Sequence, residues 1–237
     1  YYTIGENRWK TGEAWPPKEC ERRRLYLDGA ENEEAGGTGA ACGQGVLSFE
    51  KGTQEGRDEY VYDPENPSVH LVDMSENELE VPEDYTQEET RPDILSYSTP
   101  VLEKPLTITG DARVRLYVSC DCPDTDFVVR LTDVDEKGRS IKLADSVLDA
   151  KYRNGPERPE YMEPGKVYEV NLRTTKISNT FLPGHRLRLT ITSSAKNFIF
   201  PNSNTKDGFD SQIRQKARIT VLRGGTEASF LEVWEEL

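Results

Sequence analysis

Hydrophobic and polar residues alternate with a period of two over most of the chain after Pro92. Alternation of this kind, with β-branched or aromatic residues at the apolar positions, is typical of β-strands that have one face in a core. We therefore predict strands in the segments that show it, which are residues 106–110, 112–119, 127–134, 166–172, 185–193, 217–222 and 229–234.

The polar positions of these segments indicate sheets with one wet face. In 112–119 the arginines at 113 and 115 alternate with Val114 and Leu116, and 185–193 repeats the pattern. Antiparallel sheets commonly pack one face on a core and leave the other in water. Turn signals such as Pro183-Gly184 suit antiparallel connections, and no long amphipathic segment is available to cross over between parallel strands. The fold class predicted is all-β, as an antiparallel jelly-roll β-sandwich of eight to ten strands.

The first part of the chain is more polar and less regular. Short candidate strands lie at 24–27, 46–49 and 59–62. Between and after them, residues 31–45 are rich in glycine and acid, and residues 74–91 are rich in acid. Segments with so few apolar residues read as exposed loops.

The net charge of the chain argues against two classes of binding partner. The 237 residues include 30 Lys+Arg and 43 Asp+Glu, which gives a formal net charge of -13. A chain of this charge repels phosphate backbones and anionic lipid, so nucleic acid and membrane are not expected partners. No stretch approaches the ~18 apolar residues of a membrane span.

A search for hydrolytic chemistry returns mainly absences. The chain has no Gly-x-Ser-x-Gly motif, and its only histidines are His70, in a polar loop, and His185, after Pro183-Gly184. A histidine beside a turn more often bonds a backbone carbonyl than acts as a base, so we interpret His185 as structural. The sequence predicts no catalytic, cofactor-binding or metal-binding residue in this chain.

The best candidate for a polar site is the acidic loop that holds Asp121, Asp124 and Asp126. Alternating aspartates resemble part of a calcium loop, but the central glycine and terminal glutamate of that pattern are missing. We favour an Asx-turn, in which the side chains accept bonds from turn amides, and leave a mononuclear calcium site or a glycosidase-like carboxylate pair as alternatives.

Cysteines and aromatic residues suggest little chemistry. Cys20, Cys42, Cys120 and Cys122 are read as free thiols rather than as a disulfide scaffold or a zinc site, and free thiols favour a reducing, cytoplasmic compartment. The tryptophans Trp9, Trp15 and Trp234 are far apart; Tyr117 and Phe127 are the pair that could meet across strands as a sugar platform. Arg22, Arg23 and Arg24 form the one basic run, which we expect to face an acidic surface.

Several motifs in a fixed order resemble one family. They are residues 5–9 (GENRW) with Trp15-Pro16, 60–67 (YVYDPENP), 95–99 leading into 106–110, 118–126, 127–133, 138–141, 164–165, 181–186 (FLPGHR), 193–194 with 197–198, and 202–205 (NSNT). Together they resemble the C-terminal part of the α/β-hydrolase group that includes cocaine esterase, X-Pro dipeptidyl-peptidase and glutaryl-7-ACA acylase. The chain departs from that group where it reads SSAKNF at 193–198 and EVW at 232–234.

The resemblance implies a galactose-binding-like jelly roll appended to a catalytic domain whose Ser, Asp and His lie upstream. Residues 1–23 would then be the end of the hydrolase domain and a linker, and residues 24–237 the sandwich. The resemblance implies a noncatalytic domain of a hydrolase that acts on esters or amides. Our hypothesis for its role is packing on the upstream hydrolase domain, with Arg22–Arg24, Trp9 and Trp15 as contacts, and helping to wall the substrate cleft. A carbohydrate-binding module is the alternative, and a homo-oligomer is a further partner left open.

Overall fold

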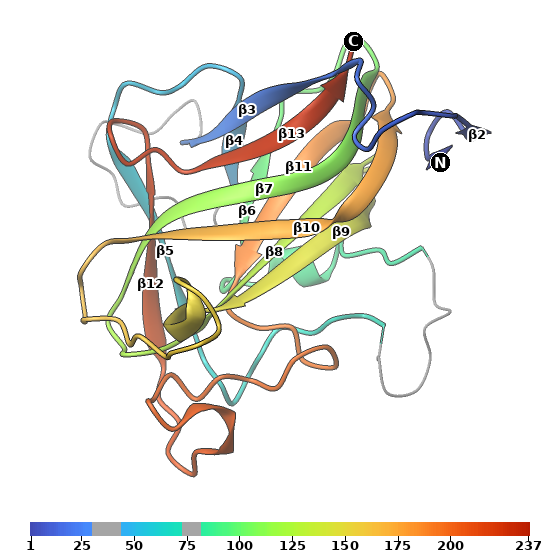
Figure 1. The fold of residues 1–237 in the computed structure, drawn as a ribbon. Coiled ribbons are helices and arrows are strands. Elements are labelled where there is room, and N and C mark those ends of the chain that lie inside the picture. The colour runs from blue at the N-terminus through green and yellow to red at the C-terminus, as the bar shows by residue number, and fades with distance from the viewer. Residues whose placement is uncertain (30–43, 73–81) are drawn as a thin grey trace.

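The computed structural model describes residues 1–29, 44–72 and 82–237, and most of its regular structure is β-strand (Figure 1). The strands are β1 (Tyr2–Thr3), β2 (Arg8–Trp9), β3 (Cys20–Asp28), β4 (Gln44–Ser48), β5 (Gly56–Tyr62), β6 (Leu95–Ser98), β7 (Leu106–Cys120), β8 (Asp126–Val134), β9 (Ser140–Asp149), β10 (Tyr168–Phe181), β11 (Arg186–Thr192), β12 (Ala217–Arg223) and β13 (Phe230–Glu236). The helical turns are η1 (Glu88–Thr90), η2 (Ala150–Tyr152) and η3 (Gly208–Asp210). Within the described ranges, no helix has the length and apolar character needed to cross a bilayer.

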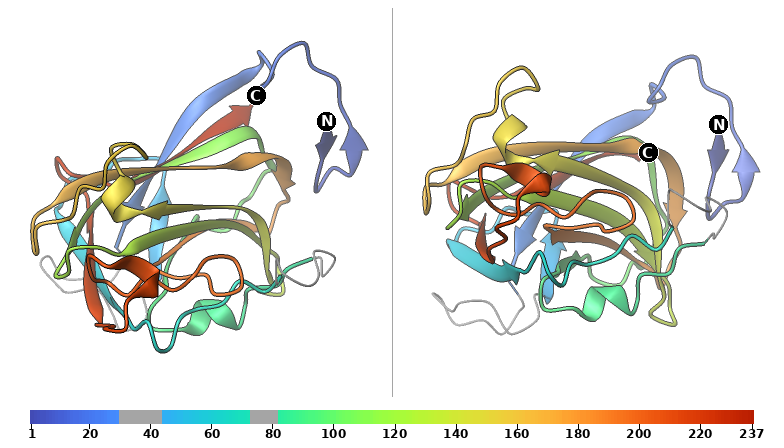
Figure 2. Two further views of the ribbon diagram at one scale, coloured as in Figure 1. Left: turned by 60° about the horizontal axis from the view of Figure 1, so that its bottom comes forward. Right: turned by 90° about the horizontal axis from the view of Figure 1, so that it is seen from below.

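Eleven of the strands form one continuous hydrogen-bonded sheet that curls over itself. The strand order is β5-β12-β7-β13-β3-β4-β6-β11-β8-β9, and β10 pairs with β7. The strands β7 and β10 lie in one layer, while β8 and β9 lie in the other (Figure 2). Side chains such as Leu25, Leu116 and Phe127 fill the space between the layers and are 0% exposed. The predicted all-β sandwich is confirmed.

One strand pair differs from the predicted antiparallel arrangement. The strands β4 and β6 run parallel, with Gln44 opposite Ser96 and Val46 opposite Ser98. Parallel neighbours need a long connection, and the chain from residue 49 to residue 94 provides it by passing through β5 at the far side of the sheet.

The predicted strands match the structure best where apolar residues alternate without interruption. Residues 106–110 and 112–119 lie in a single strand, β7, which runs through Gly110 and Asp111 without a break. A Cβ atom at Gly110 would lie 2.5 Å from Cδ1 of Trp234, so the glycine is needed for the close approach of that ring. The strand β10 extends well beyond the predicted end at Leu172, past a register shift between Arg173 and Lys176. The strands β6 and β9 were not predicted.

The acidic segment 74–91 is only partly as expected. Residues 30–43 and 73–81 lie outside the described residues, so the structure describes only residues 44–45 of the first predicted loop and residues 82–91 of the second. The prediction of an exposed loop is wrong at Tyr85, which is 0% exposed, and its ring lies 3.5 Å from the Arg130 guanidinium. Glu89 accepts a 2.6 Å bond from Nη1 of Arg188 on β11, so this part of the segment packs against the sandwich.

The first nineteen residues lie beside the sandwich rather than in it. The strands β1 and β2 form a short hairpin that projects beyond the beginning of β3, near the C-terminus (Figures 1 and 2). Two backbone bonds join it to β10: the Ile4 amide donates to the Ser178 carbonyl at 3.0 Å, and the Thr180 amide donates to the Ile4 carbonyl at 2.8 Å. The main sheet begins at Cys20 in β3.

Candidate functional site

His70 is held in a buried polar network. Its Nδ1 lies 2.8 Å from the carbonyl oxygen of Val72, and its Nε2 lies 3.2 Å from Oδ2 of Asp145 and 2.7 Å from Nζ of Lys142. Burial opposes ionisation of Asp145, but the bonds from His70 and Lys142 outweigh it and lower the Asp145 pKa to about 2. The ring therefore anchors a loop to β9 through a carboxylate.

His185 also has a carboxylate partner, and it is on a neighbouring strand. Its Nδ1 lies 2.8 Å from Oδ1 of Asp133 on β8. The predicted bond to a turn carbonyl is therefore replaced by a side-chain pair. Among the described residues, neither imidazole has a Ser, Thr or Cys side chain as a hydrogen-bond partner. A histidine–aspartate pair without a hydroxyl or thiol partner does not make a nucleophile.

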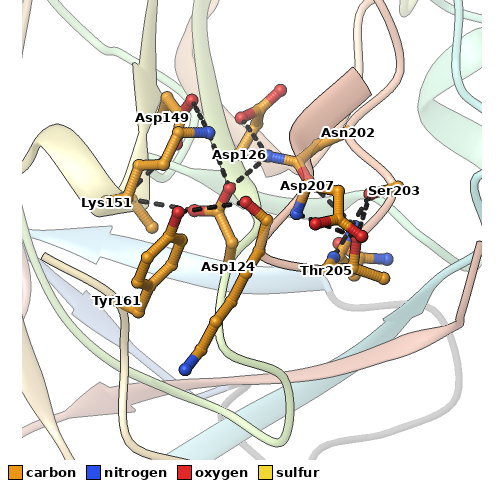
Figure 3. Close-up of polar contacts among 12 residues, drawn as sticks. Asp124, Asp126, Asp149, Lys151, Tyr161, Asn202, Ser203, Thr205 and Asp207 are labelled. Carbon is orange, nitrogen blue, oxygen red and sulfur yellow. Dashed lines mark hydrogen bonds and ion pairs between the residues drawn. The ribbon is translucent and has the colours of Figure 1, made fainter. Parts of the chain in front are cut away.

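The three aspartates of the predicted polar site take different positions. Asp121 is exposed and accepts a 2.8 Å bond from the backbone amide of Arg218. Asp124 is 0% exposed and Asp126 is 6% exposed, and the two share one partner, the Asn202 side-chain amide (Figure 3). Asn202 Nδ2 donates to Oδ2 of Asp124 at 3.1 Å and to Oδ1 of Asp126 at 3.0 Å.

A lysine supplies the positive charge of this centre. Nζ of Lys151 lies 2.9 Å from Oδ2 of Asp124 and 2.6 Å from Oδ2 of Asp149, at the end of β9. The Lys151 backbone amide also donates to Oδ1 of Asp124 at 3.2 Å. The Asx-turn hypothesis is wrong for these aspartates, because the N–H groups that bond them in the described part of the chain belong to Lys151, Asn202 and Arg218, far along the sequence. The ammonium group stands among the carboxylates as their counter-charge.

We call the cluster of Asp124, Asp126, Asp149, Lys151 and Asn202 the Asp124 centre. Burial controls the protonation of its carboxyl groups. It raises the pKa of Asp126 to about 8, against the opposing effect of the Asn202 bond, and it raises the pKa of Asp149 to about 6. Burial would lower the pKa of Lys151, but its bonds to Asp124 and Asp149 raise it instead. The centre therefore joins the 124–126 loop, the β9 end and the Asn202 loop through one buried salt bridge and a carboxyl that stays protonated to an unusually high pH.

Sequence reasoning missed Lys151, Asp149 and Asn202 as members of this centre. They are more than 20 residues from the aspartates, and no local spacing connects them. One signal was available: residues 118–126 and 202–205 were two of the motifs that carry the family resemblance. Buried polar side chains normally have hydrogen-bond partners, and in the 202–205 motif Asn202 has the buried aspartates as partners.

The described cysteines are buried thiols. They are Cys20, Cys120 and Cys122, whereas Cys42 lies outside the described residues. The side-chain donor atoms of Cys120, Asp121 and Cys122 all lie within 4.8 Å of one another. The Cys122 thiol donates to Oδ1 of Asp121 and to the Lys216 carbonyl, each at 3.4 Å, so the group is already bonded internally.

The predicted aromatic pair does not form a platform. Phe127 is 0% exposed in the core, so it cannot meet Tyr117 at the surface. Trp234 is covered by the Arg22 guanidinium at 4.7 Å. Trp9, in contrast, is 78% exposed, and its ring contacts that of Tyr2 with centroids 5.5 Å apart. Trp15 is partly buried and packs edge-on against Tyr1, with centroids 5.3 Å apart.

A second exposed apolar surface lies on the loop between β11 and β12. Phe200 and Phe209 are 73% and 53% exposed, and their rings stack with centroids 5.1 Å apart. Ile213, on the same loop, is 69% exposed, and Phe198 stacks on His70 at 5.0 Å. Several exposed apolar side chains on one loop, two of them stacked on each other, are a candidate contact surface. We call Phe198, Phe200, Phe209 and Ile213 the loop patch.

The arginine run is divided by the alternation of β3. Arg22 and Arg24 line a pocket on the outward face of the sheet, together with arginines of other strands. Arg23 is directed elsewhere, with its guanidinium 5.2 Å from the Phe49 ring and 3.4 Å from a carboxylate oxygen of Glu235. The three residues therefore do not act as one basic surface.

Comparison with known proteins places this geometry in context. The model of the X-Pro dipeptidyl-peptidase C-terminal non-catalytic domain matches residues 1–232. The cocaine esterase of Rhodococcus sp. (strain MB1 Bresler) is 35% identical over 206 residues, which are 86% of this chain and 35% of that protein. The chain thus spans about a third of the length of that curated relative.

Two solved structures are similar over nearly the whole chain. An aminopeptidase from a marine sediment Thaumarchaeota archaeon has a TM-score of 0.87 and 26% identity, and the match covers 100% of this chain and 40% of that one. An alpha-amino acid ester hydrolase has a TM-score of 0.85 and 27% identity, with 99% of this chain and 40% of that chain covered.

Proposed function

The chain belongs to the family of X-Pro dipeptidyl-peptidase C-terminal non-catalytic domains, and from this membership we propose that it packs on a catalytic α/β-hydrolase domain of the same polypeptide. The observation that carries the proposal is the match over residues 1–232 to a domain that is described as non-catalytic. Relatives named as an esterase, an aminopeptidase and an ester hydrolase support hydrolysis of esters or amides as the activity of the catalytic domain.

The N-terminal hairpin is one contact that we assign to the hydrolase domain. Trp9 is 78% exposed and lies on a hairpin that projects from the sandwich. Burial of a large aromatic side chain stabilises an interface by roughly 1.5–3 kcal/mol. A tryptophan left in water forgoes that stabilisation, so a covering partner is favoured.

The loop patch is the second contact, and we propose that it helps to wall the substrate cleft. Its side chains come from a long loop at one end of the sandwich, and the Asp124 centre fixes that loop through Asn202. Interfaces between domains of one chain typically bury ~600–1,500 Å². Aromatic rings on a firmly held loop suit the apolar wall of a cleft.

Two measurements test the docking role. The 237-residue chain alone should not hydrolyse p-nitrophenyl esters or Ala-Pro-p-nitroanilide. It should bind the separately produced hydrolase domain of its polypeptide, and replacing Phe200 and Phe209 together with serine should weaken that binding by at least about tenfold, because two rings lose their apolar contact. Binding is measured by titration calorimetry, and hydrolase activity is followed on the same mixtures.

The matched control is Val101→Ser. Val101 is 48% exposed and lies between β6 and β7, at the opposite end of β11 from the loop patch. This variant should bind like the original chain, and Trp9→Ser should weaken binding through the hairpin. Equal affinity of the Phe200/Phe209 variant and the original chain would contradict the role of the loop patch, and ester turnover by the chain alone would contradict the noncatalytic assignment.

A further inference from the structure

A pocket of about 410 Å³ lies on the outward face of the sheet. It spans β3, β13, β7 and β10, which are neighbours in this order (Figure 1). Its walls carry five arginines from three strands: Arg22 and Arg24 of β3, Arg113 and Arg115 of β7, and Arg173 of β10. Phe230 and Glu232 of β13 lie between them. In a chain of net charge -13, such a concentration of guanidinium groups is a local reversal of sign.

The carboxylates around the pocket do not neutralise it. Glu232 is shared between Arg24 at 3.0 Å and Arg22 at 3.7 Å. Asp111 is likewise shared between two arginines, with Nε of Arg173 at 2.6 Å and Nε of Arg113 at 3.5 Å. Glu169 is 3.3 Å from Arg115. The five arginines therefore share three carboxylates, and each guanidinium group has five N–H donors, more than these ion pairs use.

One aromatic ring, that of Phe230, holds arginines on two sides of the pocket. The guanidinium carbons of Arg24 and Arg115 lie 4.6 Å and 5.3 Å from the Phe230 ring centroid, one on each flank of β13. Phe230 itself is only 7% exposed, so it is a support rather than a stacking surface for a ligand. Contacts of this kind orient the guanidinium groups before any ligand arrives, which lowers the entropic cost of binding.

We propose that this pocket binds a small anion that carries two or more phosphate or carboxylate groups. Because β13 lies between β3 and β7, the two arginine-bearing flanks are about 10 Å apart at the backbone. A ligand with two anionic groups can engage both flanks at once. Guanidinium groups pair with phosphate and carboxylate oxygens through two parallel bonds, and the volume is in the usual range for small ligands.

Titration calorimetry at low ionic strength tests the proposal with three probes: inorganic pyrophosphate, citrate and trigalacturonate. We expect saturable binding of at least one, and the comparison separates phosphate, simple carboxylate and acidic-sugar ligands. Arg24→Gln and Arg115→Gln should each weaken the affinity by about tenfold, since each removes one charged partner. Glu232→Gln should strengthen it, because the competing carboxylate is gone, and a gain in affinity cannot result from misfolding.

The control variant is Arg218→Gln. Arg218 is 58% exposed, pairs with Glu59 at 3.6 Å and lies outside the pocket. It should bind the probe as the original chain does. No saturable binding of any probe would overturn the proposal. An equal loss of affinity in Arg218→Gln and Arg24→Gln would also overturn it, because that result would indicate general attraction to charge. Weaker binding by Glu232→Gln would overturn it as well.

Discussion

Replacing Asp124 with alanine is expected to lower the free energy of unfolding by about 3–5 kcal/mol, the usual cost of removing one partner of a buried ion pair. Asp124 is 0% exposed and accepts bonds from the Lys151 ammonium, the Lys151 amide and the Asn202 side chain. Without it, the ammonium retains Asp149, which is 32% exposed, as its carboxylate partner, and Nδ2 of Asn202 retains Asp126 as its acceptor. The loss exceeds that of a typical surface change because charged and polar groups are left buried with too few partners.

Urea denaturation of the 237-residue chain measures this loss, with Asp210→Ala as the control. Asp210 is exposed in η3, so its replacement should change stability little. Asp124→Asn should be milder than Asp124→Ala, because the amide oxygen can still accept a bond. Combining Asp124→Leu with Lys151→Met should recover part of the loss, since the buried ammonium is removed together with its buried carboxylate and the remaining partner, Asp149, is 32% exposed to water. If Asp124→Ala and Asp210→Ala were equally stable, the ion pair would have no structural role.

Contacts between residues far apart in the chain leave no local pattern in the sequence. This explains which parts of the fold could be predicted from the sequence and which could not. The strands β7, β8, β11 and β12 have apolar residues at alternating positions, and the pattern alone predicted them. The family resemblance, which rested on motifs spread over the chain, is confirmed by the match over residues 1–232. Both predictions used information that lies within short segments.

The strand β9 and the second half of β10 could not be predicted in the same way. Of the ten residues of β9, only Ser140 and Ala144 are fully buried; the others are half-buried and many of them polar, so its alternation is weak. In β10 the register shift between Arg173 and Lys176 interrupts the period of two. Tyr85 was missed for a related reason: a single aromatic residue in an acidic segment gives no periodic signal, although the Arg130 guanidinium covers its ring.

The Asp124 centre shows that the prediction of a candidate site from sequence has the same limit as the prediction of strands. Asp121, Asp124 and Asp126 were recognised as a candidate, but their partners Lys151 and Asn202 come from other loops, and only the fold brings them together. The sequence could name the acidic half of the centre and not its counter-charge. The question of what balances the charge of the aspartates therefore needed the structure.

Asp126 is expected to make the stability of the chain depend on pH between about 4 and 8. Its pKa is about 8 in the folded chain, because burial disfavours the carboxylate, whereas an unfolded aspartate has a pKa of about 3.9. Between these values the folded state holds a proton that the unfolded state lacks, so stability falls as the pH rises and is greatest below pH 4 as far as this group is concerned. Asp149, with a pKa of about 6, adds to the fall in the lower half of this range.

The variant Asp126→Asn isolates this contribution, because its amide resembles the protonated carboxyl and can still accept the bond from Asn202. We expect the variant to match the original chain near pH 4 and to exceed its stability at pH 8 by on the order of 5 kcal/mol, because about four pKa units separate the folded and unfolded carboxyl groups, with a flatter profile above pH 6. Urea denaturation at a series of pH values measures both profiles, and Asp210→Asn at the exposed η3 position should leave the original profile unchanged. Parallel profiles of Asp126→Asn and the original chain from pH 5 to pH 8 would mean that Asp126 is ionised in the folded state, and the buried centre would then contain two carboxylates in need of the single Lys151 ammonium.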